Sequence, residues 1–194
     1  MIPATLKQSY TPEDLLTMPD RDSFELVDGE LVERNMGWKS SWIGGRLYFF
    51  LSTYCESRNS GWVAPADASY QCFPDDSHKV RKPDVSFIRQ ERLTADQEPE
   101  GHCRIAPDLA VEVISPNDLY SEVEVKVDEY LQAGVTLVWV IDPATHTVRV
   151  HRANGSVADL KEDDELDGEN VLPEFRCAVR ELFRTPGSQK GGAN

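Results

Sequence analysis

Apolar and polar positions along the chain predict several strands and a few helices. Residues 23–35, "SFELVDGELVERN", alternate around Asp28-Gly29, a dipeptide typical of a tight hairpin turn. The segments "GWVAPADASYQCF" and "KPDVSFI" are predicted strands, and "DLAVEVIS" and "VTLVWVID" have the continuous apolar character of buried strands. Further along, "TVRVHR" and "VADLKE" predict two short strands.

Helical spacing and capping residues predict three helices between these strands. Thr11 and the proline after it begin a short helix in "YTPEDLLTMP". Apolar side chains recur at helical spacing over residues 42–54, and a third helix is expected from about Asp118 to Ala133, closed by Gly134. The end, "LPEFRCAVRELF", is expected to pass from a strand into an amphipathic segment.

The order of these elements predicts an α/β or α+β fold with a mixed central sheet flanked by helices. The strand–helix–strand unit over residues 109–141 is expected to contain two parallel strands joined by a right-handed crossover. A length of 194 residues favours a single domain, which we place at residues 1–185, followed by a flexible tail at 186–194.

Composition and charge limit the classes of function. The formal net charge of −14 argues against a broad electrostatic grip on nucleic acid, because basic residues supply most of the non-specific affinity for DNA. Any phosphate-binding surface must be local, and the one dense basic stretch is "HKVRKPDVSFIRQER", residues 78–92. Taken alone, such a stretch is more often a solvated charged surface.

Targeting signals and cysteine usage predict a cytoplasmic protein. The start of the sequence lacks the pattern of a signal peptide, and no apolar run approaches the roughly 20 residues that a membrane span needs. Four scattered cysteines, without zinc-type spacing to the histidines, are expected to be free thiols. The four tryptophans are expected to be core or interface aromatics, and the acidic segment "ADLKEDDELDGEN" a solvated hairpin or loop.

A carboxylate within the apolar strand "DLAVEVIS" raises the question of what compensates its charge. The strand period places Glu112 on one face with Ala110 and Ile114. Asp84 follows Pro83 at the start of another predicted strand, so the two carboxylates converge if these strands are neighbours. Two close carboxylates repel unless one is protonated or a divalent cation lies between them, which suggests Mg²⁺ or Mn²⁺ and hydrolytic chemistry. The alternative is a turn residue at Asp84 and a structural ion pair at Glu112.

Lys126 is a third candidate for the same site. It lies at the border of the buried stripe of the helix over residues 118–133, where its ammonium group could point at the sheet. The alternative is an exposed ion pair with Glu122, four residues earlier and ideally spaced for it. The sequence alone somewhat favours this second interpretation.

Five segments in order resemble a known family. They are "ELVDGELVE", "RKPDVSFI", "APDLAVEVISPND", "KVDEYLQAGVTLVWVIDP" and "VRVHR". In this order the chain, from about Thr11 to Phe183, resembles the Uma2 family of restriction-endonuclease-like proteins, which belongs to the PD-(D/E)XK nuclease superfamily. The resemblance implies a restriction-endonuclease-like fold and a metal-dependent endonuclease that hydrolyses phosphodiester bonds in DNA.

The resemblance also implies roles for individual residues. Asp84 and Glu112 would hold the catalytic metal, Mg²⁺ or Mn²⁺, with the backbone carbonyl of Val113. The superfamily lysine would stand two residues after the glutamate, where this chain has Ile114; in the Uma2-like pattern Lys126 takes its place. Two acidic positions early in the family match Glu25 and Glu30, and one of them could complete the metal shell. Relatives often carry a histidine near the start of the helix after the hairpin, where this chain has "KSSW".

The nuclease hypothesis assigns the remaining roles and leaves one alternative. Lys126 would orient the attacking water and offset the charge that develops on the phosphate. The expected contacts to the DNA backbone are Arg81, Lys82 and Arg89. A homodimer is expected from symmetry, since a duplex has two strands to cut. The alternative is a non-catalytic binding or assembly module with the nuclease fold, which the acidic balance and the displaced lysine favour.

Overall fold

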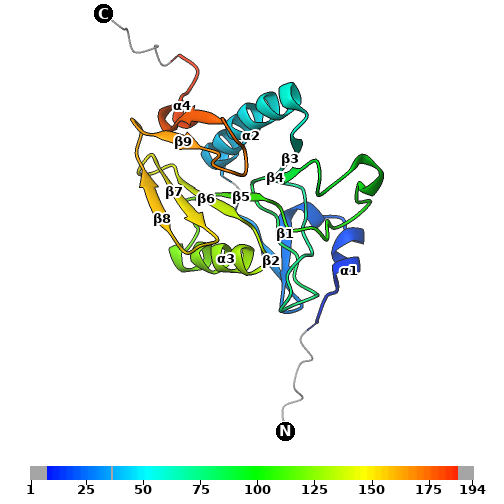
Figure 1. The fold of residues 1–194 in the computed structure, drawn as a ribbon. Coiled ribbons are helices and arrows are strands. Elements are labelled where there is room, and N and C mark those ends of the chain that lie inside the picture. Colours follow the sequence, from blue (N-terminus) through cyan, green and yellow to red (C-terminus); the bar gives the residue numbers. More distant parts are fainter. Residues whose placement is uncertain (1–7, 36, 188–194) are drawn as a thin grey trace, which may run out of the picture.

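The computed structural model describes residues 8–35 and 37–187 and has a mixed central sheet with helices packed on both faces (Figure 1). This architecture confirms the predicted α/β fold class. The elements in chain order are α1 (Pro12–Thr17), β1 (Phe24–Val27), β2 (Glu30–Glu33), α2 (Trp38–Arg58), β3 (Gly61–Pro65), β4 (Val85–Arg89), β5 (Leu109–Val113), α3 (Tyr120–Gln132), β6 (Leu137–Asp142), β7 (Thr147–Arg152), β8 (Val157–Leu160), β9 (Glu165–Asp167), β10 (Arg176–Ala178) and α4 (Val179–Phe183), with one-turn 3₁₀ helices at Arg21–Ser23 and Ala95–Gln97.

The six-stranded sheet has the order β3-β4-β5-β6-β7-β8. Strands β5 and β6 are parallel, as the strand–helix–strand pattern predicts, and every other neighbouring pair in this sheet is antiparallel. Strand β5 is buried along its whole length and lies beside β4. Because β4 and β5 are neighbours, the condition for the convergence of Asp84 and Glu112 is met.

Two hydrophobic layers, one on each face of the sheet, use alternate residues of β5. Leu109, Val111 and Val113 pack in the layer that contains α2, α4 and the β9–β10 hairpin. Ala110 belongs to the other layer, under α3, where Val123, Val127 and Tyr130 are buried. Glu112 shares the parity of Ala110, so its side chain leaves the sheet on the α3 face.

A separate hairpin, β1–β2, is joined to the rest of the chain by a bridge between Leu26 and Val80. Its turn residues Asp28 and Gly29 have positive φ angles of 50° and 76°, as the Asp-Gly pattern predicts for a tight hairpin. This hairpin brings Glu25, which is almost completely buried, toward the sheet.

Several boundaries differ from the prediction for identifiable reasons. Helix α2 extends four residues beyond the predicted segment at each end. It is closed after Arg58 by the capping residue Asn59, whose backbone is left-handed. The predicted strand over residues 61–73 keeps regular pairing only to Pro65. Helix α3 begins at Tyr120 because Asp118 accepts a hydrogen bond from the backbone N–H of Ser115 and closes a turn before the helix.

The prediction for the acidic segment was partly wrong. The acidic segment at 158–170 contributes strand β9, in which Leu166 is fully buried against the main core. Among the tryptophans, expected to be core or interface aromatics, Trp139 is buried, whereas Trp38 is 88% exposed and Trp42 is 37% exposed. Residues 188–194, most of the predicted tail, lie outside the described residues.

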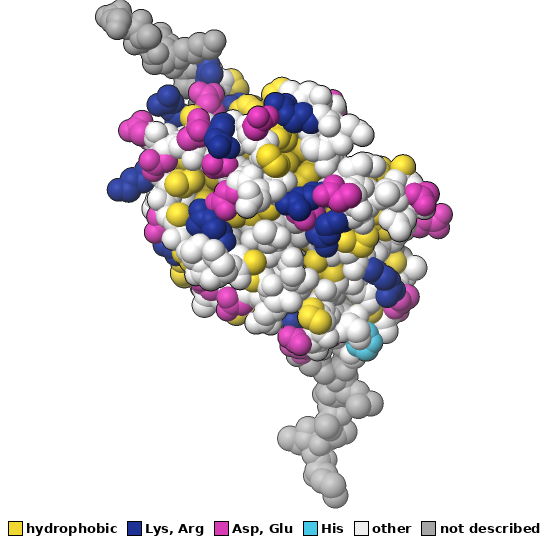
Figure 2. Space-filling model, viewed as in Figure 1, with side chains coloured by type: hydrophobic (Ala, Val, Ile, Leu, Met, Phe, Trp, Pro, Cys, Tyr) yellow, Lys and Arg dark blue, Asp and Glu magenta, His cyan; other side chains and the backbone are white. Residues whose placement is uncertain are grey.

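The surface and the cysteines agree with the composition. On the face shown in Figure 2, acidic and basic side chains are interspersed, without a continuous basic area. All four cysteines are free thiols, as predicted. No helix within residues 8–35 and 37–187 is long and apolar enough to cross a membrane.

Candidate metal centre and active site

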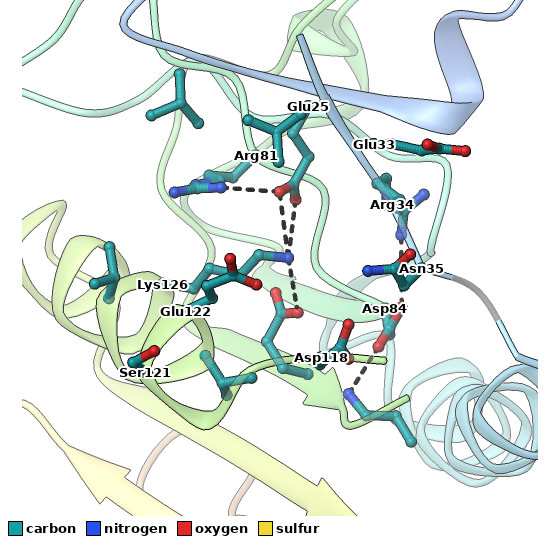
Figure 3. A pocket seen from close by; sticks show the side chains of 16 residues that line it. Glu25, Glu33, Arg34, Asn35, Arg81, Asp84, Asp118, Ser121, Glu122 and Lys126 are labelled. Carbon is teal, nitrogen blue, oxygen red and sulfur yellow. Dashed lines mark hydrogen bonds and ion pairs between the residues drawn. The ribbon is translucent and has the colours of Figure 1, made fainter. Parts of the chain in front are cut away.

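Asp84 and Glu112 meet at one end of the β4–β5 strand pair. Asp84 directly precedes β4, its backbone N–H donates to the Val111 carbonyl at 2.8 Å, and its Oδ2 accepts a 2.7 Å hydrogen bond from the N–H of Val113. Glu112 lies between those two residues of β5. Both carboxylates line one cavity of about 370 Å³ (Figure 3). The structure therefore brings together the two acids that the sequence pairs.

Burial and mutual repulsion perturb both carboxyl groups. Burial, and then the negative charge of Glu112, raise the pKa of Asp84 to about 7, although the N–H of Val113, Arg34 and Lys126 act in the opposite direction. Burial likewise raises the pKa of Glu112, and Lys126 reduces this shift. In the metal-free protein a proton on Asp84 relieves the repulsion between the two carboxyl groups. A bound divalent cation would relieve it instead and would stabilise both groups as anions.

Lys126 lies between two acidic side chains of the cavity. Its Nζ is 3.2 Å from Glu112 Oε2 and 3.2 Å from Glu25 Oε2 (Figure 3). Burial alone would lower the pKa of this amine, but Glu112 and Glu25 together raise it above its usual value. The ammonium group points at the sheet, and of the two interpretations of Lys126 the geometry supports the inward one.

Of the two early acidic residues, only Glu25 lies in the cavity. Its carboxylate accepts hydrogen bonds from Arg81 Nη1 and from the N–H of Lys82, both at 2.9 Å. Burial would raise the pKa of Glu25, but Lys126 and Arg81 outweigh it and hold that pKa below its usual value. Glu30 is exposed at the start of β2 and does not line the cavity.

Two further residues hold the acidic pair and were missed by sequence reasoning. Tyr130, fully buried in α3, donates a 2.7 Å hydrogen bond to Glu112 Oε1. Arg34, just after β2, is 3.5 Å from Asp84 Oδ1 and donates to the carbonyl of Lys82 at 3.2 Å. Tyr130 could have been found, because it lies one turn after Lys126 on the same helix face. Arg34 follows the hairpin without any pattern that marks it.

Two of the three residues predicted to contact the DNA backbone are buried, and the third, Arg89, is partly exposed. Arg81 and Lys82 are 5% and 3% exposed, so neither presents its charge to solvent. Arg81 is paired with Glu25 and Glu129, and Lys82 donates to the carbonyl of Arg21 at 2.5 Å. Arg89 donates to the Asn170 carbonyl at 2.6 Å and lies 3.8 Å from Asp108. The basic stretch mainly forms internal ion pairs, an outcome that sequence spacing alone does not distinguish from a phosphate-binding surface.

The donor set fits a small, hard divalent cation. Asp84 and Glu112 supply carboxylate oxygens, and Val113 lines the same cavity. Among residues 8–35 and 37–187, the polar contact of Asp84 Oδ1 is the long 3.5 Å contact to Arg34, which leaves this oxygen able to bind a cation. Within the described part of the chain no three His, Cys, Asp or Glu side chains are grouped as a metal site, so the residues fit a two-carboxylate centre completed by water and backbone oxygen.

Comparison with known families identifies the kind of protein. A family profile described as "Uma2: Putative restriction endonuclease" matches residues 12–180. The chain belongs to the Uma2 family. This result confirms the resemblance carried by the five sequence segments.

A solved structure shares the fold of this chain. The crystal structure of a putative nuclease belonging to DUF820 from Anabaena variabilis ATCC 29413 superposes with a TM-score of 0.75 at 21% sequence identity. The match covers 89% of this chain and 97% of the other. At this identity the comparison establishes a shared fold. No curated protein matches the chain.

Proposed function

We propose that this Uma2 protein is a metal-dependent endonuclease that hydrolyses phosphodiester bonds in DNA. The observation that carries the proposal is the convergence on one cavity of Asp84, which directly precedes β4, Glu112 of β5 and Lys126 of α3. Family membership supports a restriction-endonuclease-like hydrolase. Metal dependence and the DNA substrate are our proposals from the chemistry of these side chains.

The side chains of the cavity have distinct roles in this proposal. Asp84 and Glu112, with the carbonyl of Val113, would hold Mg²⁺ or Mn²⁺. When bound there, the cation would polarise the scissile phosphate and lower the pKa of a water molecule. Lys126 would orient the attacking water and stabilise negative charge that develops on the phosphate. Tyr130 positions Glu112 through its hydrogen bond, and Arg34 neutralises part of the charge of Asp84.

Glu25 has a supporting role rather than that of a direct metal ligand. Its carboxylate is occupied by Arg81, Lys126 and the N–H of Lys82. Arg81 and the N–H of Lys82 fix the carboxylate of Glu25, and this carboxylate contacts Lys126 on the side opposite Glu112. We therefore assign Glu25 to the positioning of Lys126, and Glu30, outside the cavity, to no catalytic role.

A specific observation favours the second candidate, a non-catalytic module with the nuclease fold. Lys126 already bridges Glu112 and Glu25, so an internal cation satisfies the acids that a metal would otherwise neutralise. The charged residues that line the cavity are also mainly acidic. They are Glu25, Glu33, Asp84, Glu112, Asp118 and Glu122, against Arg34, Arg81 and Lys126.

Cleavage and metal binding should be measured on the same variants to separate these candidates. Supercoiled, linear and single-stranded DNA are incubated with the protein in Mg²⁺, in Mn²⁺ and in EDTA. The nuclease proposal predicts that the wild-type protein cleaves DNA in Mg²⁺ or Mn²⁺ but not in EDTA. It also predicts that Asp84→Ala and Lys126→Ala do not cleave. Glu98→Gln, which alters an exposed acid outside the cavity, serves as the control and should cleave normally.

Two other results would decide against parts of the proposal. Cleavage retained by purified Asp84→Ala would overturn the assignment of the site. If wild-type protein neither cleaves any of the substrates nor gains thermal stability with either metal, the non-catalytic module is supported instead.

We also propose that the protein folds as one domain over residues 1–185 and acts as a homodimer.

A further inference from the structure

Helix α2 presents a row of aromatic side chains to solvent. Trp38, Trp42 and Phe49 are 88%, 37% and 63% exposed. With Gly45, which is also exposed, they fall within a sector of about 60° at the helical repeat of 100° per residue. Isolated exposed apolar residues are ordinary, but an aligned row on one helix face indicates a contact surface. We call Trp38, Trp42, Gly45 and Phe49 the α2 stripe.

The size of the α2 stripe is that of a modest interface. A large aromatic side chain has about 150–250 Å² of surface, so these exposures leave on the order of 400 Å² uncovered. Two copies joined through this face would bury about 800 Å² from the stripe alone, and its flanking residues would bring the total toward the roughly 1,200 Å² of small specific interfaces. The expected complex is therefore a reversible dimer.

The shape around Gly45 suits the close approach of a second helix. A groove of about 510 Å³ runs beside the stripe, and a Cβ atom placed on Gly45 would meet nothing within 4 Å. Besides residues of the stripe, the groove is lined by Arg46, Glu181 and Arg184. The missing side chain at Gly45 leaves a gap between Trp42, one turn before it, and Phe49, one turn after it.

We propose that a second copy of this chain docks on the α2 stripe, with the two α2 helices antiparallel about a two-fold axis near Gly45. Positions 42 and 49 are equally distant from the midpoint between residues 45 and 46. In this arrangement Trp42 of each copy lies beside Phe49 of the other copy, and each pair fills the gap next to a glycine. The same patch on both subunits is the property of a two-fold interface.

Charge and chain composition favour a second copy as the occupant. The four residues of the stripe carry no charge, and the flanking Arg46 and Arg184 both pair with Glu181 of their own chain, at 3.8 and 3.4 Å. Two copies of a protein with a net charge of −14 can therefore meet here without bringing unpaired acidic side chains together. The seven C-terminal residues, "SQKGGAN", have no apolar side chain larger than alanine with which to cover the aromatics.

Sedimentation velocity across a wide range of protein concentration tests the proposal. Wild-type protein should show a monomer–dimer equilibrium, and Phe49→Glu should weaken it by about tenfold or more. Gly45→Leu should also weaken the dimer, yet retain or raise thermal stability, because leucine has a higher helix propensity than glycine and meets open space in the monomer. Val157→Glu, the same type of change at a 54% exposed valine of β8, is the matched control and should leave the dimer unchanged.

A cross-link locates the interface independently of affinity. Gly45→Cys should form a disulfide-linked dimer under mild oxidation, whereas Thr53→Cys, two turns further along α2, should not link to itself. A wild-type monomer at every concentration would overturn the proposal. So would a dimer that resists both Phe49→Glu and Gly45→Leu and gives no link at position 45.

Discussion

The hydroxyl of Tyr130 donates a 2.7 Å hydrogen bond to Glu112 Oε1, while Lys126, one turn earlier on α3, lies 3.2 Å from Oε2 of the same carboxylate. One helix face therefore holds both oxygens of an acid that lies in a buried strand. This arrangement answers the question that Glu112 raises in the sequence. Its charge is compensated within the protein, and a metal would have to share it with Lys126.

Removing the hydroxyl in Tyr130→Phe should destabilise the fold and weaken metal binding. Glu112 Oε1 would lose its buried donor, which costs about 1–3 kcal/mol of unfolding free energy. Urea denaturation gives the stability, and a Mn²⁺ titration gives the affinity. Tyr120→Phe, in the same helix, removes an exposed hydroxyl that accepts a hydrogen bond from Arg149 outside the cavity; it is the control and should leave the Mn²⁺ affinity unchanged. Unchanged Mn²⁺ affinity in Tyr130→Phe would show that Tyr130 does not position a metal ligand.

The carboxyl group of Asp84 should lower the stability of the metal-free protein as the pH rises from about 4 to about 7. The folded-state pKa of Asp84 is about 7, above its ordinary value of 3.8, so between these values the folded state binds the proton more tightly than the unfolded state. The contribution of Asp84 to the unfolding free energy therefore falls with rising pH, by up to about 4 kcal/mol for a pKa raised from 3.8 to about 7.

Chemical denaturation in EDTA across this pH range measures the effect. Asp84→Asn, which cannot ionise but keeps the shape of the side chain, should flatten the dependence relative to wild type. At pH 7 it should also be more stable than the wild type without metal. Identical pH profiles for the two proteins would refute the raised pKa of Asp84.

Mn²⁺ or Mg²⁺ should stabilise the wild-type protein against heat. A ligand that binds only the folded state adds about 2.7 kcal/mol at one hundred times its dissociation constant. Thermal unfolding with increasing metal should show this shift in wild type and in Glu98→Gln. It should be absent in Asp84→Asn and strongly reduced in Glu112→Gln. A shift that survives in both cavity variants would place the metal elsewhere.

Replacing Lys126 by methionine should destabilise metal-free protein by about 3–5 kcal/mol. Glu25 and Glu112 would lose the cation between them, and an unpaired buried charge is costly. Urea denaturation in EDTA measures this loss. If the cavity binds metal, Mn²⁺ should recover part of the lost stability, because it would supply a positive charge beside Glu112. A variant as stable as wild type would contradict the bridging role of Lys126.

The sequence was sufficient to predict most strands of the central sheet, their parallel pair and the condition under which Asp84 and Glu112 converge, because these follow from local periodicity and topology. It was insufficient for side chains whose partners come from distant elements. Lys126 has a suitable partner in Glu122 on its own helix, yet it bridges Glu25 and Glu112. Arg81 and Lys82 have the spacing of a basic surface, but contacts with Glu25, Glu129 and Arg21 bury them.

Anomalous diffraction from crystals soaked in Mn²⁺ tests the central claim most directly, because it locates the metal and the amine of Lys126 together. The proposed nuclease predicts an anomalous peak between Asp84 and Glu112, with Lys126 beside it. No peak in the cavity, with Lys126 still bonded to Glu112 and Glu25, would contradict the metal centre and support the non-catalytic module.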